Sequence, residues 1–422
     1  MKKFIILFFI LPTAVFARQA DTISLTYCLQ TAIDNYPLIK QKDLLNQAAD
    51  LRLKNLNTNY YPQISLTGQA TYQSAVTEIP QISPMFSFPS MSKDQYKFYF
   101  DVNQVIWDGG VTSAMKKLES SSLQADKMNV DVETAKIKER VILAYFNILL
   151  AQHNERVIGN VKDELNSKLK KIEAGIKDEV MLQSNADVLK AEIIKADQQL
   201  IELENAKNAS LSMLSEFLNR PLNENVFLKM PEDIAVIEPA FDNKRLEMQL
   251  LDLQIRKLDI SKGITDTRLM PRFYAFGQGG YGRPGFNMLS NDFDFYYIAG
   301  VKMSWNISGF YQSGKEKRII DIQKDLLNVQ KETFNKNLKI SSQKDASDII
   351  KFGQLIGKDE EIIKLRQNIT RTASAQLENG MITATEYVTE LNAETQARLN
   401  CELHKIQKKV AEINFQNSMG KL

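Results

Sequence analysis

The feature that most constrains this chain is a long helical stretch, from about residue 112 to residue 173, in which apolar residues recur every seven positions. It contains no Pro and a single Gly, Gly159. The recurring positions are Leu123, Val130, Ile137, Ala144, Ala151, Ile158, Leu165 and Ile172. A strict step of seven predicts a helix packed in a coiled coil. About sixty residues at roughly 1.5 Å each would extend ~95 Å, far longer than a globular core needs.

The chain follows one plan twice, at a spacing of about 200 residues. The first repeat, 18–221, is expected to hold a helical stretch over 25–57 that is interrupted at 35–37, strands over 63–73 and 96–106, a long helix over 112–174 and a return helix over 179–219. The second repeat, 241–422, is expected to hold a helix over 244–266, strands over 272–282 and 293–305, a long helix over 315–378 and a return helix over 384–419. Residues 222–240 read as an irregular connector. The expected fold is therefore mainly helical, with a β contribution.

The four expected strands alternate apolar and polar residues, which is the period of a strand with one wet face and one apolar face. Aligned without a gap, Pro271 falls on Pro62 and Gly277 falls on Gly68, so the second pair of strands copies the first. The junctions between strands and helices are marked by Pro62, Gly109, Gly110, Pro271 and Gly309.

Each long helix is expected to end at a glycine, where the chain turns back. Gly175 is followed by Asp178, which would cap the first return helix. Gly380 is followed by Thr383 and Glu386, the spacing of a capping box for the second return helix.

The N-terminus predicts a secretory signal over residues 1–17. Lys2 and Lys3 precede an apolar run, and Val15 and Ala17 suit a cleavage site. An uncleaved anchor is the alternative, but the run is short for a membrane span. Removal of the signal leaves 51 basic and 51 acidic residues, a balance that gives no support to nucleic-acid binding.

No later apolar run approaches the ~18–20 residues of a spanning helix, so this chain would enter a membrane as strands. Four strands cannot close a barrel, and about eight is the smallest barrel known. A dimer would supply eight strands and a trimer twelve, and the larger barrel alone leaves a lumen that passes solutes. The alternative is an ordinary soluble sheet with one face on a core.

No motif in the sequence supports an enzyme function. The two histidines, His153 and His404, stand alone in helical patterns without metal-ligand spacing, and no phosphate loop or nucleophile motif is present. Cys28 and Cys401 are the only thiols and are expected to be small buried residues. Lipid attachment at Cys28 is disfavoured by the bulky Tyr27 before it. We expect no enzyme activity, no cofactor and no metal.

The doubled plan resembles that of the TolC-like outer-membrane efflux proteins, over essentially the whole chain after the signal. The resemblance rests on the order and double occurrence of weak motifs: Asn35-Tyr36-Pro37, Tyr61-Pro62-Gln63-Ile64-Ser65-Leu66, Trp107-Asp108-Gly109-Gly110, Leu218-Asn219-Arg220-Pro221-Leu222, Pro271-Arg272-Phe273, and the turns at Gly175 and Gly380. It implies a homotrimer with a 12-stranded barrel in outer-membrane lipid and a helical tunnel in the periplasm. It also implies a passive exit duct for small toxic compounds or polypeptides.

The resemblance further implies partners. The helical tips would dock onto a periplasmic adaptor, the membrane fusion protein, which links to an inner-membrane RND or ABC transporter in an efflux pump or a type I secretion system. The residues at the tips are Gly175, Ile176, Asp178, Gly380, Met381 and Thr383. They could equally be plain turn and cap residues.

A periplasmic gate would lie just past the second turn, at Glu386, Thr389 and Glu390. A ring of acidic residues there would favour cations. Glu386 also has a simpler role as the capping-box partner of Thr383. Ile382 stands where the resemblance would place a basic residue, so a salt-bridged lock at that position is not expected. The rival to the whole reading is a periplasmic coiled-coil protein, structural or adaptor-like, with a soluble β-domain.

Overall fold

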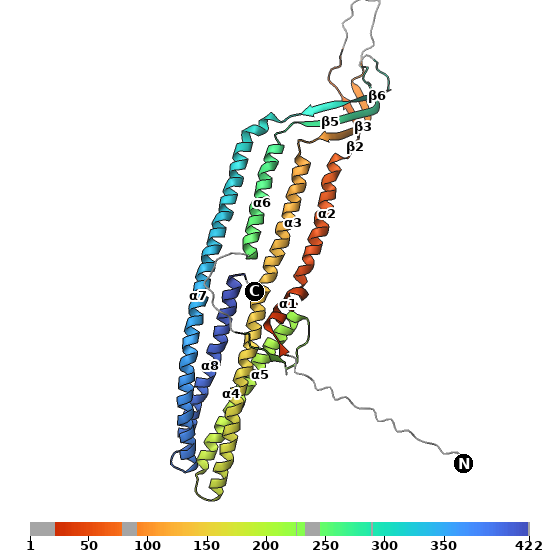
Figure 1. Ribbon diagram of the computed structural model, residues 1–422. Helices are drawn as coiled ribbons and strands as arrows, with labels where there is room; N and C mark the ends of the chain where they lie inside the picture. Colours follow the sequence, from red (N-terminus) through yellow and green to blue (C-terminus); the bar gives the residue numbers. More distant parts are fainter. Residues whose placement is uncertain (1–21, 78–90, 225, 233–244, 288–289, 421–422) are drawn as a thin grey trace, which may run out of the picture. The chain divides into compact units, whose positions relative to one another are not determined.

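The computed structural model describes residues 22–77, 91–224, 226–232, 245–287 and 290–420 (Figure 1). The expected signal over 1–17 lies outside these residues, as do residues 225 and 233–240 of the connector and residue 244, where the next helix is expected to start. The chain divides into two compact units. Unit 1 comprises residues up to 39, 133–243 and 338–422, and unit 2 comprises 40–132 and 244–337.

Unit 2 holds four helical segments and a four-stranded sheet. The helical segments lie side by side (Figure 1) and are α2 (Gln41–Asn57), α3 (Val111–Ala135), α6 (Leu246–Thr267) and the first part of α7 (Phe310–Glu378). Short 3-10 turns lie at Pro37–Lys40, Thr58–Tyr60 and Ile307–Gly309. Helix α7 begins five residues before the predicted start at 315, directly after the last of these turns.

A ladder of ion pairs joins α6 to α7. Three aspartates of α6, seven residues apart, each meet a lysine of α7, and the lysines are also seven residues apart. The pairs are Asp252–Lys331, Asp259–Lys324 and Asp266–Lys317. Because one series rises as the other falls, the two helices run antiparallel. Ion pairs that are open to solvent add little stability, so the ladder chiefly sets the register of the two helices.

The sheet of unit 2 is antiparallel throughout, with strand order β2-β3-β5-β6. Its strands are β2 (Gln63–Tyr72), β3 (Asp94–Trp107), β5 (Arg272–Arg283) and β6 (Asp294–Ser304). Strand β3 is longer at both ends than the predicted 96–106, and a bulge between Val105 and Trp107 marks its end.

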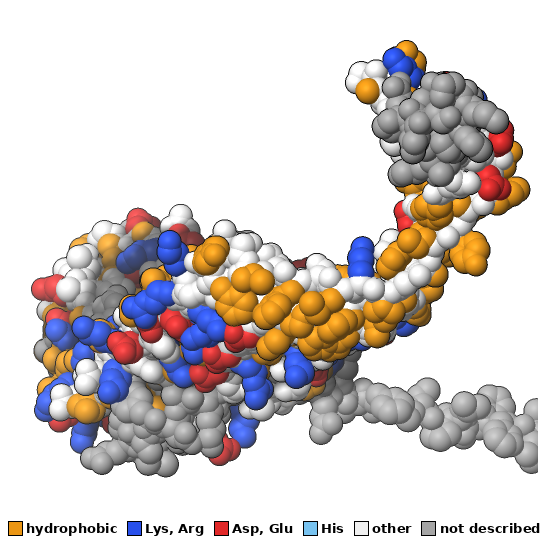
Figure 2. Space-filling view, turned by 90° about the horizontal axis from the view of Figure 1, so that it is seen from above, with side chains coloured by type: hydrophobic (Ala, Val, Ile, Leu, Met, Phe, Trp, Pro, Cys, Tyr) orange, Lys and Arg blue, Asp and Glu red, His pale blue; other side chains and the backbone are white. Residues whose placement is uncertain are grey.

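The two faces of this sheet differ sharply. Register places Leu66, Phe100, Gly279 and Tyr297 in one row across the four strands, and the neighbouring row holds Thr67, Tyr99, Gly280 and Tyr296. In the first row the large apolar side chains are exposed, from 54% for Leu66 and Phe100 to 85% for Tyr297. Figure 2 shows hydrophobic side chains gathered along the sheet. This unit therefore offers an uncovered apolar face about the length of its strands.

Unit 1 holds the rest of the helices around two main hydrophobic clusters and a third, smaller one. Its elements are α1 (Leu25–Asn35), α4 (Ile137–Lys177), α5 (Gln183–Leu218), the last part of α7, α8 (Ala384–Ser418) and a small parallel pair of β1 (Thr22–Ile23) with β4 (Phe227–Leu228). Tyr145 is fully buried in the larger cluster. Its hydroxyl lies 3.0 Å from the carbonyl oxygen of Ile23 and 2.5 Å from that of Lys229, which fixes β1 and β4 against α4.

The apolar residues that recur every seven positions are buried along most of their length, as that period predicts. From Val130 to Ile172 each seam residue is 5% exposed or less, whereas Leu123 at its start is half-buried. The predicted single helix over 112–174 is instead two, because α3 ends at Ala135 and α4 begins at Ile137. Lys136 between them keeps helical backbone angles, so the break is a local irregularity. Among the described residues no helix is long and apolar enough to cross a membrane.

Candidate functional site: the hairpin tips

The ends of two helical hairpins, α4–α5 and α7–α8, share one hydrophobic cluster in unit 1. Its fully buried members come from all four helices: Leu165, Ala186, Leu189, Leu377, Ala384 and Tyr387. The side-chain oxygen of Asn185 on α5 accepts a hydrogen bond, 3.0 Å long, from the backbone N–H of Ala384 at the start of α8. One hairpin therefore helps to cap the other, and the tips form a single packed site.

The turn after α7 is built on Gly380, as the sequence predicts. Gly380 has a φ of +68°, in the region that favours glycine. Its N–H bonds to the carbonyl of Leu377, and the N–H of Met381 bonds to that of Gln376 at 2.8 Å. These two bonds form a Schellman motif, which satisfies the free carbonyls at the helix end.

The turn after α4 uses the same motif but not the predicted residue. Glu179, with a φ of +57°, takes the place that Gly380 takes in the other hairpin. The N–H of Val180 bonds to the carbonyl of Gly175 at 2.9 Å, and that of Glu179 bonds to Ile176 at 3.1 Å. The prediction that Gly175 makes the reversal is wrong, because Gly175 lies inside α4.

Gly175 has a different physical role. A Cβ built on it would lie 2.9 Å from Cγ of Met181, so the missing side chain makes room for Met181 to fold back on the helix. The prediction that Asp178 caps the return helix is also wrong. Asp178 is the last residue of the α4 cap, and α5 begins only at Gln183, after Leu182. Sequence reasoning treated the nearest glycine as the turn, whereas here a glutamate adopts the left-handed conformation.

The tips expose apolar residues that the sequence analysis partly missed. Met381 is 72% exposed, and the other hairpin presents Val180 and Leu182 at 73% and 71%. Apolar residues within a turn, where polar ones are usual, were the available signal. Ile176, by contrast, is half-buried and packs on the shared cluster.

Polar contacts fasten the hairpins just behind the tips. The hydroxyl of the buried Tyr387 donates to a carboxylate oxygen of Glu164, 2.8 Å away. Glu378 of α7 is ion-paired with both Lys168 and Lys171 of α4. Hydrogen bonds from these two lysines lower the pKa of Glu378 to about 2.

The predicted gate residues lie on a groove between α7 and α8. Its volume is about 600 Å³, and it is lined by Asn368, Ile369, Thr372, Ala373, Gln376, Ile382, Glu386, Thr389 and Glu390. Glu386 is engaged in the capping box, because its carboxylate accepts from the Thr383 N–H at 2.7 Å. Its hydrogen bonds with the backbone and side chain of Thr383 lower the pKa of the Glu386 carboxyl. Glu390 is ion-paired with Arg366 of α7 at 2.9 Å. The basic residue that pairs with Glu390 is therefore Arg366 of α7 and not a residue at position 382, two residues past the turn glycine.

The junction between β3 and α3 is organised by Asp108, a residue of the quoted motif to which the sequence analysis gave no role of its own. Its carboxylate accepts from the N–H of Gly110 at 2.9 Å and from that of Thr112 at 2.7 Å. Gly109 and Gly110 both have positive φ, and a Cβ on Gly109 would lie 2.8 Å from Met270. Aspartate and glycines together therefore turn β3 into α3.

The remaining junction residues have distinct surroundings. Pro62 follows the 3-10 turn and immediately precedes β2, and Pro271 immediately precedes β5. Gly309 packs against Leu269, to which a Cβ would come within 3.2 Å.

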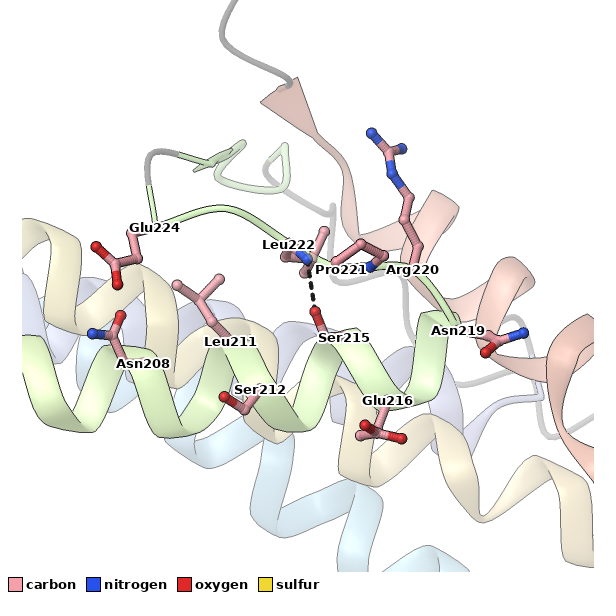
Figure 3. Close-up of a pocket in the computed structure, with 10 residues that line it drawn as sticks. All are labelled: Asn208, Leu211, Ser212, Ser215, Glu216, Asn219, Arg220, Pro221, Leu222 and Glu224. Atoms are coloured by element: carbon pink, nitrogen blue, oxygen red, sulfur yellow. Dashed lines mark hydrogen bonds between the residues drawn. The ribbon is translucent and has the colours of Figure 1, made fainter.

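A second depression, of about 530 Å³, lies at the end of α5 (Figure 3). Asn219 is left-handed there, and the N–H of Leu222 donates to the hydroxyl of Ser215 at 2.7 Å. Asn35 of α1 donates to the carbonyl of Leu218, also at 2.7 Å. These bonds give the motif from Leu218 to Leu222 a structural role as a helix stop.

Neither a protein-family model nor a curated protein matches the sequence. Solved structures do match. The CmeC outer membrane channel of Campylobacter jejuni is 13% identical with a TM-score of 0.66, covering 94% of this chain and 85% of that one. VceC of Vibrio cholerae, an outer membrane protein, is 12% identical with a TM-score of 0.61, covering 94% and 96%. The open state of the MtrE outer membrane channel of Neisseria gonorrhoeae is 12% identical with a TM-score of 0.59, covering 94% and 88%.

This chain has the fold of these outer-membrane channels. At such low identity the likeness concerns the fold, and it extends over both repeats. In the part of the channel fold that the structure describes, no three metal-ligating side chains come together. His153 instead meets Glu402 at 2.5 Å and His404 meets Asp359 at 2.6 Å, so both histidines join helices of unit 1.

Proposed function

We propose that this protein is a channel-tunnel of the outer membrane, the passive exit duct of a tripartite efflux pump or a type I secretion system. The observation that carries this proposal is the sheet of unit 2. Among the described residues its outer strands β2 and β6 each pair on one side only, and its apolar face is exposed. A soluble sheet would cover that face, whereas lipid would solvate it.

The open edges require other copies of the chain. Backbone groups cannot stay unpaired in hydrocarbon, so β2 of one subunit would pair with β6 of the next. Three copies give twelve strands, and the second face, with Thr67, Gln69 and Gly280, would line the lumen. Such a homotrimer passes solutes without chemistry of its own, driven by an inner-membrane RND or ABC transporter.

The tips would be the docking site for a periplasmic adaptor. Val180, Leu182 and Met381 offer exposed apolar side chains on two rigid turns, which suits an opposing helical hairpin. Opening would shift α8 against α7, and the pair of Arg366 with Glu390 holds these helices together. Small toxic compounds and polypeptides remain the two candidate classes of cargo.

The sheet proposal is tested by two lysines on neighbouring residues. Leu66→Lys places a charge on the apolar face, where a lysine in lipid costs about 2–4 kcal/mol in each subunit. Thr67→Lys places the same charge on the opposite face, where water would solvate it. We expect Leu66→Lys to abolish assembly in the outer-membrane fraction and Thr67→Lys to preserve it. Equal yields from both variants, or wild-type protein in the soluble periplasm, would support the rival coiled-coil protein.

A further inference from the structure

A cavity of about 710 Å³ lies between α4, α7 and α8, entirely within unit 1. That volume is in the range of pockets that bind small organic molecules. Its apolar lining comes from all three helices: Ile142, Leu143, Phe146, Leu150, Phe352, Leu403, Ile406, Val410 and Ala411. Phe146 and Ile406 are almost fully buried, whereas Leu143 is 61% exposed, so the cavity has a packed floor and opens to solvent beside α4.

Asp345 of α7 lines this cavity and is 8% exposed. Among the described residues, no hydrogen bond or ion pair engages its carboxylate. Its surroundings raise its pKa, chiefly through burial and also through the nearby Asp348, while Lys344 acts in the opposite direction. Burial disfavours the charged form of this carboxyl, but its oxygens are not among the fully buried side-chain atoms that lack a partner, so they remain open to water or to a ligand.

Lys344 also lines the cavity and attracts the charge of Asp345, but the two form no ion pair, and the other charged groups of the lining are acidic. Asp348 is bound to Lys351 at 2.6 Å, and Glu139 of α4 adds a further negative charge. Helix α8 contributes only neutral side chains to the lining. Lys351 also lies 4.1 Å from the ring centre of Phe352, so an aromatic face at the cavity already attracts a cation.

We propose that this cavity binds an organic cation with a bulky apolar body, with Asp345 as its counter-ion. The apolar walls would take the body, and the carboxylate would meet the charge. The inference does not depend on the proposed duct, because the three helices belong to one unit of one chain.

The probe is a pair of ions of the same shape and opposite charge, tetraphenylphosphonium and tetraphenylborate. Binding is measured by equilibrium dialysis of the purified full chain in detergent against the same detergent alone. We expect the phosphonium to bind and the borate to bind at least about tenfold more weakly, since an interaction with a charged partner changes affinity by about 10- to 100-fold.

Asp345→Asn is the decisive variant, because it keeps the shape and removes the charge. It should weaken phosphonium binding by about 10- to 100-fold. Asp348→Asn is the matched control on the same cavity, and it should change binding by less than about threefold because its charge is already paired. Circular dichroism and gel filtration verify that both variants are folded. Absence of phosphonium binding to the wild type, equal binding of both ions, or unchanged binding in folded Asp345→Asn would each overturn the proposal.

Discussion

The turn at Glu179 tests directly whether a residue with a side chain in the left-handed conformation strains the hairpin. A residue other than glycine in the left-handed region costs about 1–2 kcal/mol, because its Cβ crowds the backbone. Glu179 has a φ of +57°, and its side chain is exposed at the tip. Glu179→Gly should therefore stabilise the turn by about 1 kcal/mol, slightly less than the strain removed, since glycine is also more flexible when unfolded.

The second hairpin supplies the reciprocal change. Gly380 has a φ of +68° with open space around its missing Cβ, so Gly380→Ala adds strain without a clash. It should destabilise its turn by about 1 kcal/mol. Glu179→Ala is the neutral control, because alanine is no better suited than glutamate to a positive φ.

The assay is native-state hydrogen exchange at the amides that close each turn. A change of about 1 kcal/mol in local opening alters the exchange rate by about fivefold. The Val180 amide should exchange about fivefold more slowly in Glu179→Gly, and the Met381 amide about fivefold faster in Gly380→Ala. Faster exchange in Glu179→Gly would refute the assignment of strain to this turn.

Three further predictions concern unit 1. Tyr387→Phe removes the hydroxyl that donates to Glu164. Because Glu164 is exposed, water can replace the lost donor, so the free energy of unfolding should fall by about 0.5–1.5 kcal/mol in denaturant titration. Glu386→Ala breaks the capping box and should increase fraying at the start of α8, and with Glu386 at the lumen face it should also lower the cation selectivity measured from reversal potentials. A hydrogen bond from His153 lowers the pKa of Glu402 from 4.5 to about 2, so its stabilisation is complete above pH 4.5 and is lost as the pH falls toward 2. The loss is up to about 3 kcal/mol and should be absent from that pH window in Glu402→Gln.

Much of the architecture follows from local patterns. The seven-residue seam predicts the buried residues of α4, because a period of seven keeps one face of a helix against its neighbours. The alternation of apolar and polar residues predicts the strands, because successive side chains of a strand point to opposite faces of the sheet. The aspartates of α6 and the lysines of α7 also recur every seven residues, and this second pattern predicts that the two helices pair. The sequence analysis did not use it because it considered the period of apolar residues alone.

The tips and the junction were harder to predict, since their geometry depends on backbone conformation. Residue type favours Gly175 as the turn, but the carbonyls at the end of α4 are satisfied one turn later, at Glu179. Asp108 stands in the motif that the sequence analysis quotes, but its role as acceptor for the amides two and four residues further on depends on the backbone conformation at Gly109 and Gly110. The isolation of Asp345 is likewise invisible in sequence, because it depends on which side chains three separate helices place around it.

Single-channel recording in planar lipid bilayers tests the central proposal most directly. The purified full chain should run as a trimer in mild detergent and give discrete, long-lived conductance steps, because twelve strands enclose an aqueous lumen. The Leu66→Lys variant should give none. A monomer that remains soluble without detergent and produces no conductance would contradict the account.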